Sequence, residues 1–216
     1  MNNRPMIVAV LLLAGLVLSL AAAPHARAQV GKNMGLLNPN TAGAEEFAGL
    51  PGLNPDLAGR IVAGRPYLNM EALDKALASA LSADQRKELY ARLFLPINLN
   101  NASVEAIRMV PGVGRRMSWE FREYRPYRAL AEFQREIGKY VDDAEVARLE
   151  QYVFVPIKLN SASDAHLRTI PGLGEEVLKM IRDSRPFTGM EDFRGRMSAH
   201  AGKGEVARLA RYLTIE

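Results

Sequence analysis

The chain has 216 residues, of which 48% are hydrophobic, and it contains no cysteine. The lack of cysteine excludes disulfides, iron–sulfur clusters, zinc–thiolate sites, haem attachment and thiol catalysis. The formal net charge of +4 falls to +2 without Arg4 and Arg27, because 26 basic residues then face 24 acidic ones. A nearly neutral chain is not a polybasic module, so any nucleic-acid binding must depend on where single charges lie.

Residues 1–28 have the order of a secretory signal peptide. Arg4 precedes the apolar run 6–23, which is followed by Pro24 and an Ala-Arg-Ala sequence ending at Ala28. Cleavage after Ala28 would export the chain to the periplasm or the medium. The alternative is a membrane anchor, because eighteen apolar residues approach the length of a spanning helix. The helix-breaking Pro24 and the small residues at the cleavage site favour removal.

After a short segment, 29–36, the chain repeats with a period of sixty residues. The recurring features are Pro-Gly at Pro51, Pro111 and Pro171, Asn40, Asn100 and Asn160, and Arg-Pro-aromatic at Arg65, Arg125 and Arg185. A long fixed period is typical of stacked repeat proteins rather than of single-core enzymes. We expect three units, residues 37–96, 97–156 and 157–216, packed end to end through short apolar junctions.

Each unit should contain about four short helices, which makes the fold all-α. In the middle unit Ser103 is a good N-cap for the first helix. The second helix should cover 115–125, because Pro126 disfavours helix at the residue before it. Apolar spacing places the third helix at about 130–137 and the fourth at about 144–153. Residues 97–99 and 157–159 are expected to be extended.

Several recurring residues have structural interpretations. The three recurring arginines should satisfy the last carbonyls of the second helix of each unit. The three recurring asparagines should form turns, since Asn side chains bond readily to nearby backbone. Other expected roles are core positions for Tyr67, Tyr127, Phe187 and Phe121 and surface positions for His166 and His200.

The order helix, hydrophobic-Pro-Gly-hydrophobic-Gly, helix resembles the helix-hairpin-helix motif. The runs INLNNAS at 97–103 and VPGVG at 110–114 resemble the ComEA-type exported DNA-binding proteins of natural competence. That resemblance implies binding of double-stranded DNA without sequence preference. The first unit, through LPGLNP at 50–55 and LSADQRK at 81–87, resembles PsbU, an extrinsic protein of photosystem II. This second resemblance implies a periplasmic protein-interaction or complex-stabilising subunit that does not bind DNA.

The hairpin chemistry explains how such a unit can bind phosphate. Glycines permit a tight turn whose N–H groups converge with the positive N-terminus of the following helix on an anion. The middle unit has Gly112 and Gly114 in the hairpin, and Arg115 and Arg116 directly after it. These four residues are the predicted phosphate site.

The other two hairpins are weaker candidates. The third unit keeps Gly172 and Gly174, which we include in the predicted site, but Glu175 and Glu176 follow them and should repel a phosphate. The first unit has Asn54 in place of the second glycine. Only one hairpin in three therefore fits DNA well, and tight helix connection is the alternative role for all of them.

A second candidate surface surrounds the single tryptophan. Arg115, Trp119 and Arg122 lie at i, i+4 and i+7 of the second helix, with Arg108 nearby. We expect Trp119 to belong to a binding face for phosphate or protein, or else to pack against a neighbouring unit.

The sequence carries no sign of catalysis. It has no nucleophile–base pair, no metal-ligand spacing and no P-loop. We expect a non-enzymatic binding module without cofactor, metal or small-molecule substrate.

Overall fold

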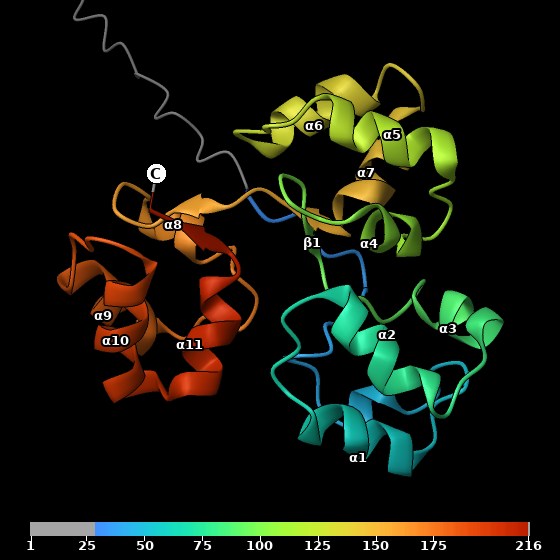
Figure 1. Cartoon of the computed structure of the whole chain (residues 1–216), viewed down its shortest axis with the longest axis horizontal. Helices are drawn as coiled ribbons and strands as arrows, with labels where there is room; N and C mark the ends of the chain where they lie inside the picture. Colours follow the sequence, from blue (N-terminus) through green and yellow to red (C-terminus); the bar gives the residue numbers. More distant parts are fainter. Residues whose placement is uncertain (1–28, 216) are drawn as a thin grey trace, which may run out of the picture.

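The computed structural model describes residues 29–215, and the predicted signal peptide with its cleavage site at Ala28 lies outside them. The described chain is mostly helical, with eleven α-helices, one 3-10 helix and four two-residue strands (Figure 1). This confirms the all-α class. No helix within 29–215 is long and apolar enough to cross a membrane.

The helices follow one another in three segments. The first segment, 37–96, contains a 3-10 helix (Glu45–Phe47), α1 (Pro55–Ala63), α2 (Met70–Ala78) and α3 (Ala83–Leu89). The middle segment, 97–156, contains α4 (Val104–Met109), α5 (Arg115–Glu123), α6 (Leu130–Ile137) and α7 (Asp143–Glu150). The third segment, 157–215, contains α8 (Asp164–Leu167), α9 (Glu175–Asp183), α10 (Met190–Ala201) and α11 (Lys203–Ala210).

Each segment closes on itself by pairing its first residues with its last. The four strands are β1 (Ile97–Asn98), β2 (Val153–Phe154), β3 (Ile157–Lys158) and β4 (Leu213–Thr214). The pairs β1–β2 and β3–β4 are parallel, and a parallel bridge joins Leu37 to Leu93 in the first segment. The fourth helix of the middle segment ends at Glu150 and not near residue 153, because Val153 enters β2.

The recurring asparagines link distant parts of each segment. The side chains of Asn40, Asn100 and Asn160 bond to both the N–H and the C=O of the residue 27 positions later, at 2.7–2.9 Å. Each asparagine lies in a turn as expected, but the expectation that its side chain bonds to nearby backbone is wrong. That later residue follows the Arg-Pro pair outside any helix, so its peptide groups need a side-chain partner.

The recurring arginines bond to the same loop and not to their own helix. Arg65 donates to the carbonyls of Pro39 and Ala42, and Arg125 and Arg185 reach the equivalent loop 23 to 26 residues before them. The predicted helix-capping role is wrong because each guanidinium turns inward to these loop carbonyls. Burial lowers the pKa of all three groups.

The core is mainly aliphatic, contains several aromatic pairs and falls into two clusters. One cluster runs without a break through the first and middle segments, and it includes the edge-to-face pair Phe121–Phe133, with ring centroids 5.0 Å apart. The second cluster fills the third segment together with Val30 and Phe154. Tyr67, Tyr127 and Phe187 are buried as expected, and so is Phe121. His200 is exposed, whereas His166 is half-buried because the short α8 packs against α9.

The third segment touches both of the others. Arg211, just after α11, donates to the carbonyl of Pro96 at 2.6 Å and to that of Leu68 at 3.2 Å. The segment 29–36 adds a further link, because Val30 forms an antiparallel bridge with Phe154. An end-to-end stack would separate the first segment from the third, so the three segments cluster instead of forming a line (Figure 1).

Candidate functional site

The turn between α4 and α5, residues 110–114, is here called the middle hairpin. Gly112 has φ +81°, in the left-handed region that favours glycine, and Gly52 and Gly172 have similar values in the equivalent turns. Arg148 of α7 donates to the carbonyl of Pro111 at 2.7 Å and is itself held by Glu145 at 2.6 Å. Helix α7 therefore fixes the shape of the middle hairpin.

The second glycine of the middle hairpin has a different role from the one expected. Gly114 is the N-cap of α5 with φ −88°, a conformation that any residue adopts, so the turn does not require glycine there. A Cβ at this position would meet no atom within 4 Å. The hairpin thus leaves open space in front of the helix N-terminus.

The three helices that follow the hairpins differ in the partners of their first backbone N–H groups. In α1 the side chain of Asn54 accepts the N–H of Leu57 at 2.8 Å, which caps the helix internally. The helices α5 and α9 have no side-chain cap. The first turn of α5 contains no acidic residue, whereas that of α9 contains Glu175 and Glu176. Only α5 combines free amide groups with local positive charge.

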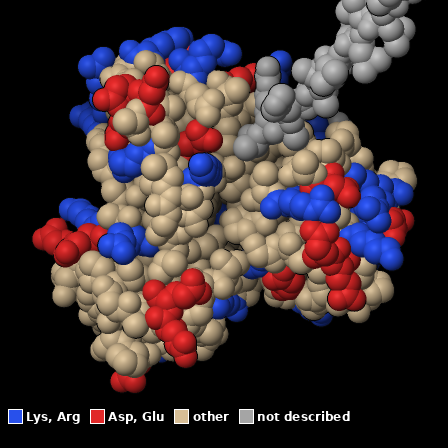
Figure 2. Space-filling model, turned by 180° about the vertical axis from the view of Figure 1, so that it is seen from behind, with Lys and Arg blue, Asp and Glu red and all other residues tan. Residues whose placement is uncertain are grey.

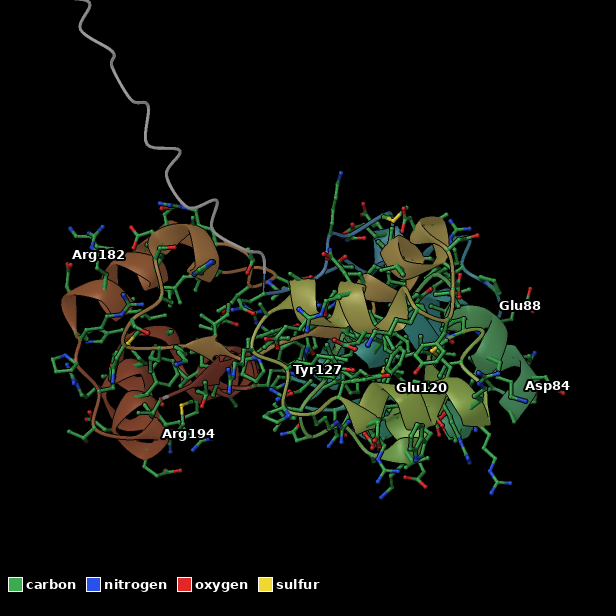
Figure 3. All side chains as sticks on the ribbon, turned by 90° about the horizontal axis from the view of Figure 1, so that it is seen from above. Asp84, Glu88, Glu120, Tyr127, Arg182 and Arg194 are labelled. Atoms are coloured by element: carbon green, nitrogen blue, oxygen red, sulfur yellow. The ribbon has the colours of Figure 1, made fainter. Side chains whose placement is uncertain are left out.

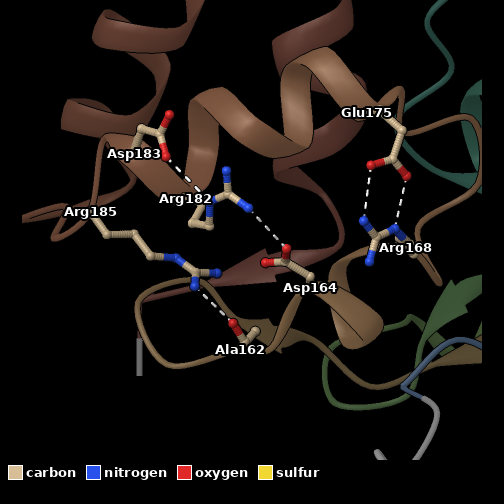
Figure 4. A network of polar contacts seen from close by, with 7 residues as sticks. All are labelled: Ala162, Asp164, Arg168, Glu175, Arg182, Asp183 and Arg185. Atoms are coloured by element: carbon tan, nitrogen blue, oxygen red, sulfur yellow. Dashed lines mark hydrogen bonds and ion pairs between the residues drawn. The ribbon is translucent and has the colours of Figure 1, made fainter.

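The arginines around the two uncapped helices also differ. In the third segment Arg168 binds Glu175 through two bonds of 2.8 and 2.9 Å, and Arg182 contacts Asp164 at 3.3 Å and Asp183 at 3.2 Å (Figure 4). The hydrogen bonds with Arg168 lower the pKa of Glu175. The cations of this hairpin are therefore neutralised within the chain.

The corresponding cations of the middle segment are free. Arg108, Arg115 and Arg122 are exposed, and within residues 29–215 none of them forms an ion pair or a hydrogen bond through its side chain. Figure 2 shows positive side chains along the upper edge of the molecule, where the middle segment lies. Arg116 is exposed as well, with its guanidinium carbon 5.9 Å from the ring centre of Tyr140. The cluster Arg108, Arg115, Arg116 and Arg122 is here called the arginine face.

Trp119 lies on the arginine face and is 54% exposed. The alternative considered from the sequence, burial of this side chain against a neighbouring segment, is therefore not observed. Gly59 and Lys179 occupy the equivalent positions of α1 and α9, so the helix itself does not need an aromatic residue there.

A polar cluster beside α5 that contains one buried carboxylate was not anticipated. Glu120 is only 5% exposed, and its Oε2 has no hydrogen-bond partner (Figure 3). Beside it the hydroxyls of Tyr124 and Tyr140 are 2.7 Å apart. The hydrogen bond with Tyr124, together with the nearby Glu120 carboxylate, raises the pKa of Tyr140. Helical periodicity gives no signal for this buried carboxylate, because Glu120 is a charged residue that stands between Trp119 and Phe121 in the sequence.

The hairpin-supporting arginines were also missed, although the sequence contains a signal for them. Glu-Val-Ala-Arg-Leu occurs twice, sixty residues apart, and supplies Arg148 and Arg208. Arg208 is buried and donates to the carbonyls of Pro171 and Gly172. A Cβ on Gly172 would lie 2.8 Å from Thr41, so the third hairpin packs closely against the first segment.

Within residues 29–215 no group of three or more His, Asp or Glu side chains is placed to hold a metal ion. Comparison of the chain with known protein families, with curated proteins and with solved structures finds no match.

Proposed function

We propose that this protein is an exported, non-enzymatic binding module that binds double-stranded DNA without sequence preference through the middle hairpin. The amide groups at the N-terminus of α5, with Gly112 and Gly114 keeping the approach open, would bind one phosphate. Arg115 and Arg116 would neutralise that phosphate and its neighbour, and the rest of the arginine face would extend the contact.

The proposal includes the repeat architecture of a helix-hairpin-helix protein. Each of the segments 37–96, 97–156 and 157–215 contains a Pro-Gly turn with a left-handed glycine, an asparagine link across 27 residues and a parallel closure of its ends. These shared features support three related units, of which only one has kept its anion site.

One observation carries the functional proposal. The helix after the middle hairpin is uncapped and surrounded by unpaired arginines, whereas α1 is capped by Asn54 and α9 is neutralised by Glu175. A cationic cluster that the chain does not neutralise itself is placed to meet an external polyanion.

The experiment is a fluorescence anisotropy titration of the mature protein against labelled duplex DNA. Four arginine–phosphate contacts would give a slope of about −3.6 in log affinity against log salt, a loss of roughly 100-fold between about 50 and 200 mM. Arg115→Glu with Arg116→Glu should abolish most binding. Lys75→Glu with Lys179→Glu changes the net charge equally at exposed sites away from the middle hairpin and should have a much smaller effect.

The reciprocal variant tests the third hairpin. Glu175→Lys with Glu176→Lys removes two acidic residues at the N-terminus of α9 and also frees Arg168 from its ion pair, so DNA binding should become stronger. Absence of binding to any duplex at the lower salt would refute the proposal. It would favour the protein-interaction alternative, for which the exposed Trp119 is the first residue to mutate.

Export is part of the same proposal and has its own test. Cleavage after Ala28 makes Gln29 the first residue, which mass spectrometry of protein from the native envelope should detect. Intact Met1 in the membrane fraction would instead establish an uncleaved anchor.

A further inference from the structure

We propose that Trp119 is a stacking platform for an unpaired nucleobase, so that the arginine face prefers DNA with a single-stranded end or gap over blunt duplex. This inference rests on the proposed DNA binding and specifies the form of DNA that the site takes. It starts from the side chain that neither the fold nor the phosphate site explains.

The indole makes no aromatic or cation–π contact within residues 29–215. Trp119 is 54% exposed, and no ring contact between residues 29 and 215 involves it. The other aromatic residue that is classed as exposed, Tyr140, bonds to Tyr124 and lies beside Arg116. Among the described residues, Trp119 is therefore the most exposed aromatic side chain, and more than half of its surface is open to a ligand.

The charge around the indole selects the chemistry of the occupant. Arg115 lies four residues before Trp119 and Arg122 three residues after it, so both flank the same side of α5. Neither arginine has an acidic partner in the described chain, because Glu120 is buried under the helix and the exposed Glu123 forms no ion pair with either of them. A flat apolar group between unpaired guanidinium groups fits a ligand that is both aromatic and anionic, which is the composition of a nucleotide.

The spacing along α5 allows one strand to use both parts of the site. The phosphate site is at the first turn of the helix, beside Gly114 and Arg115, and Trp119 follows four residues after Arg115, roughly 6 Å along the axis. A strand whose phosphate lies at the helix N-terminus can therefore place an adjoining base on the indole. In blunt duplex both faces of a paired base are covered by its neighbours in the stack, so the indole would reach only the backbone.

Trp119 is the only tryptophan of the chain, so its fluorescence reports directly on stacking. The probes are three labelled DNAs of equal total length: a single strand, a blunt duplex and a duplex with a single-stranded overhang. Anisotropy gives the affinity for each probe, and the tryptophan emission is recorded in the same titrations. We expect emission to be quenched by the single strand and the overhang, with affinities about 5- to 150-fold above that for blunt duplex.

Variants assign the effect to the indole. Trp119→Ala should remove the preference while leaving blunt-duplex affinity within about twofold, and Trp119→Phe should restore part of it because a flat ring is kept. Lys179→Ala, at the equivalent position of α9, is the control and should change neither affinity nor preference.

The outcomes separate the two proposals. Equal affinities for the three probes without quenching would overturn the stacking inference while leaving duplex binding in place. An unchanged preference in Trp119→Ala would also overturn it, because another group would then read the unpaired base. If no probe binds at low salt, the proposed DNA-binding function fails together with the inference.

Discussion

The uncapped N-terminus of α5 can be tested by giving it the cap that α1 already has. Gly114→Asn places a side chain at φ −88° and ψ −172°, close to the φ −104° and ψ 169° of Asn54. No atom lies within 4 Å of a Cβ at this position, so the new side chain fits. Its oxygen should accept the N–H of Met117, just as Asn54 accepts the N–H of Leu57 at 2.8 Å.

This substitution should stabilise the folded protein slightly but weaken its binding to DNA. The free energy of unfolding should rise by only about a few tenths of a kcal/mol, because Asn is a slightly better N-cap than Gly. DNA affinity should fall, because one amide that would bind phosphate now bonds to the side chain. A hydrogen bond to a charged group contributes about 1.5–3 kcal/mol, which corresponds to a loss of roughly 10- to 100-fold.

Urea denaturation and duplex-DNA anisotropy measure the two effects on the same protein. Gly174→Asn is the matched control, because Gly174 is the uncapped N-cap of α9 and likewise has nothing within 4 Å of its Cβ. Its affinity for DNA should stay unchanged, since Glu175 already disfavours phosphate there. If Gly114→Asn binds duplex as tightly as the natural protein, or if the two variants lose affinity equally, the assignment of the phosphate site to α5 is wrong.

Three further predictions concern stability, each measured by urea denaturation. Gly112→Ala should cost about 1–2 kcal/mol, because φ +81° is unfavourable for any residue with a Cβ; no loss would mean that the turn relaxes. Asn100→Ala should cost about 2–4 kcal/mol, because it leaves the N–H and C=O of Tyr127 without their partner. The exposed Asn101→Ala is its control, and equal losses would refute the linking role. Phe121→Ala should cost about 3–5 kcal/mol from a fully buried site, and a loss below about 1 kcal/mol would contradict the assigned core.

The sequence predicts the helices of this protein well because their boundaries have local chemical causes. The start of α5 at Arg115 and the extent of α6 from Leu130 to Ile137 agree with expectation, since Gly, Pro and apolar spacing act within a few residues. The parallel strand pairs were not expected. Strands of two residues carry no alternation, and their partners lie 56 positions away, as in Ile97 and Val153.

The partners of the recurring polar residues were predicted wrongly because they are distant in the sequence. Asn100 and Arg125 were given partners within their own turn or helix, because local hydrogen bonding is the general rule for such residues. Their actual partners are 23 to 27 residues away along the chain. An exact sixty-residue recurrence signals that a residue matters to the unit, but it does not say which distant group that residue touches.

The charges that distinguish the three hairpins can be found in the sequence, whereas the contacts that surround them cannot. The ranking of the three hairpins came from Arg115, Glu175 and Asn54, and each acts over the single turn that follows it, which a sequence can describe. The neutralising contact of Arg168 with Glu175 spans a hairpin, and the burial of Glu120 depends on the packing of α5 against its neighbours, which include α6. Neither can be inferred from spacing alone.

The three hairpins share one backbone turn and differ in how the following helix is satisfied. An internal cap on α1, ion pairs around α9 and free amides on α5 are alternative solutions to the same unsatisfied N-terminus. The first two solutions keep the charge balance within the chain, whereas the third leaves the amides open to solvent or, as we propose, to an outside anion. A protein with one such site gains only a few phosphate contacts per molecule, so its affinity for DNA should be modest. Tight retention of DNA would then require several copies bound along the same duplex or held together at a surface. The high effective concentration of binding sites would then raise the overall affinity above that of a single hairpin.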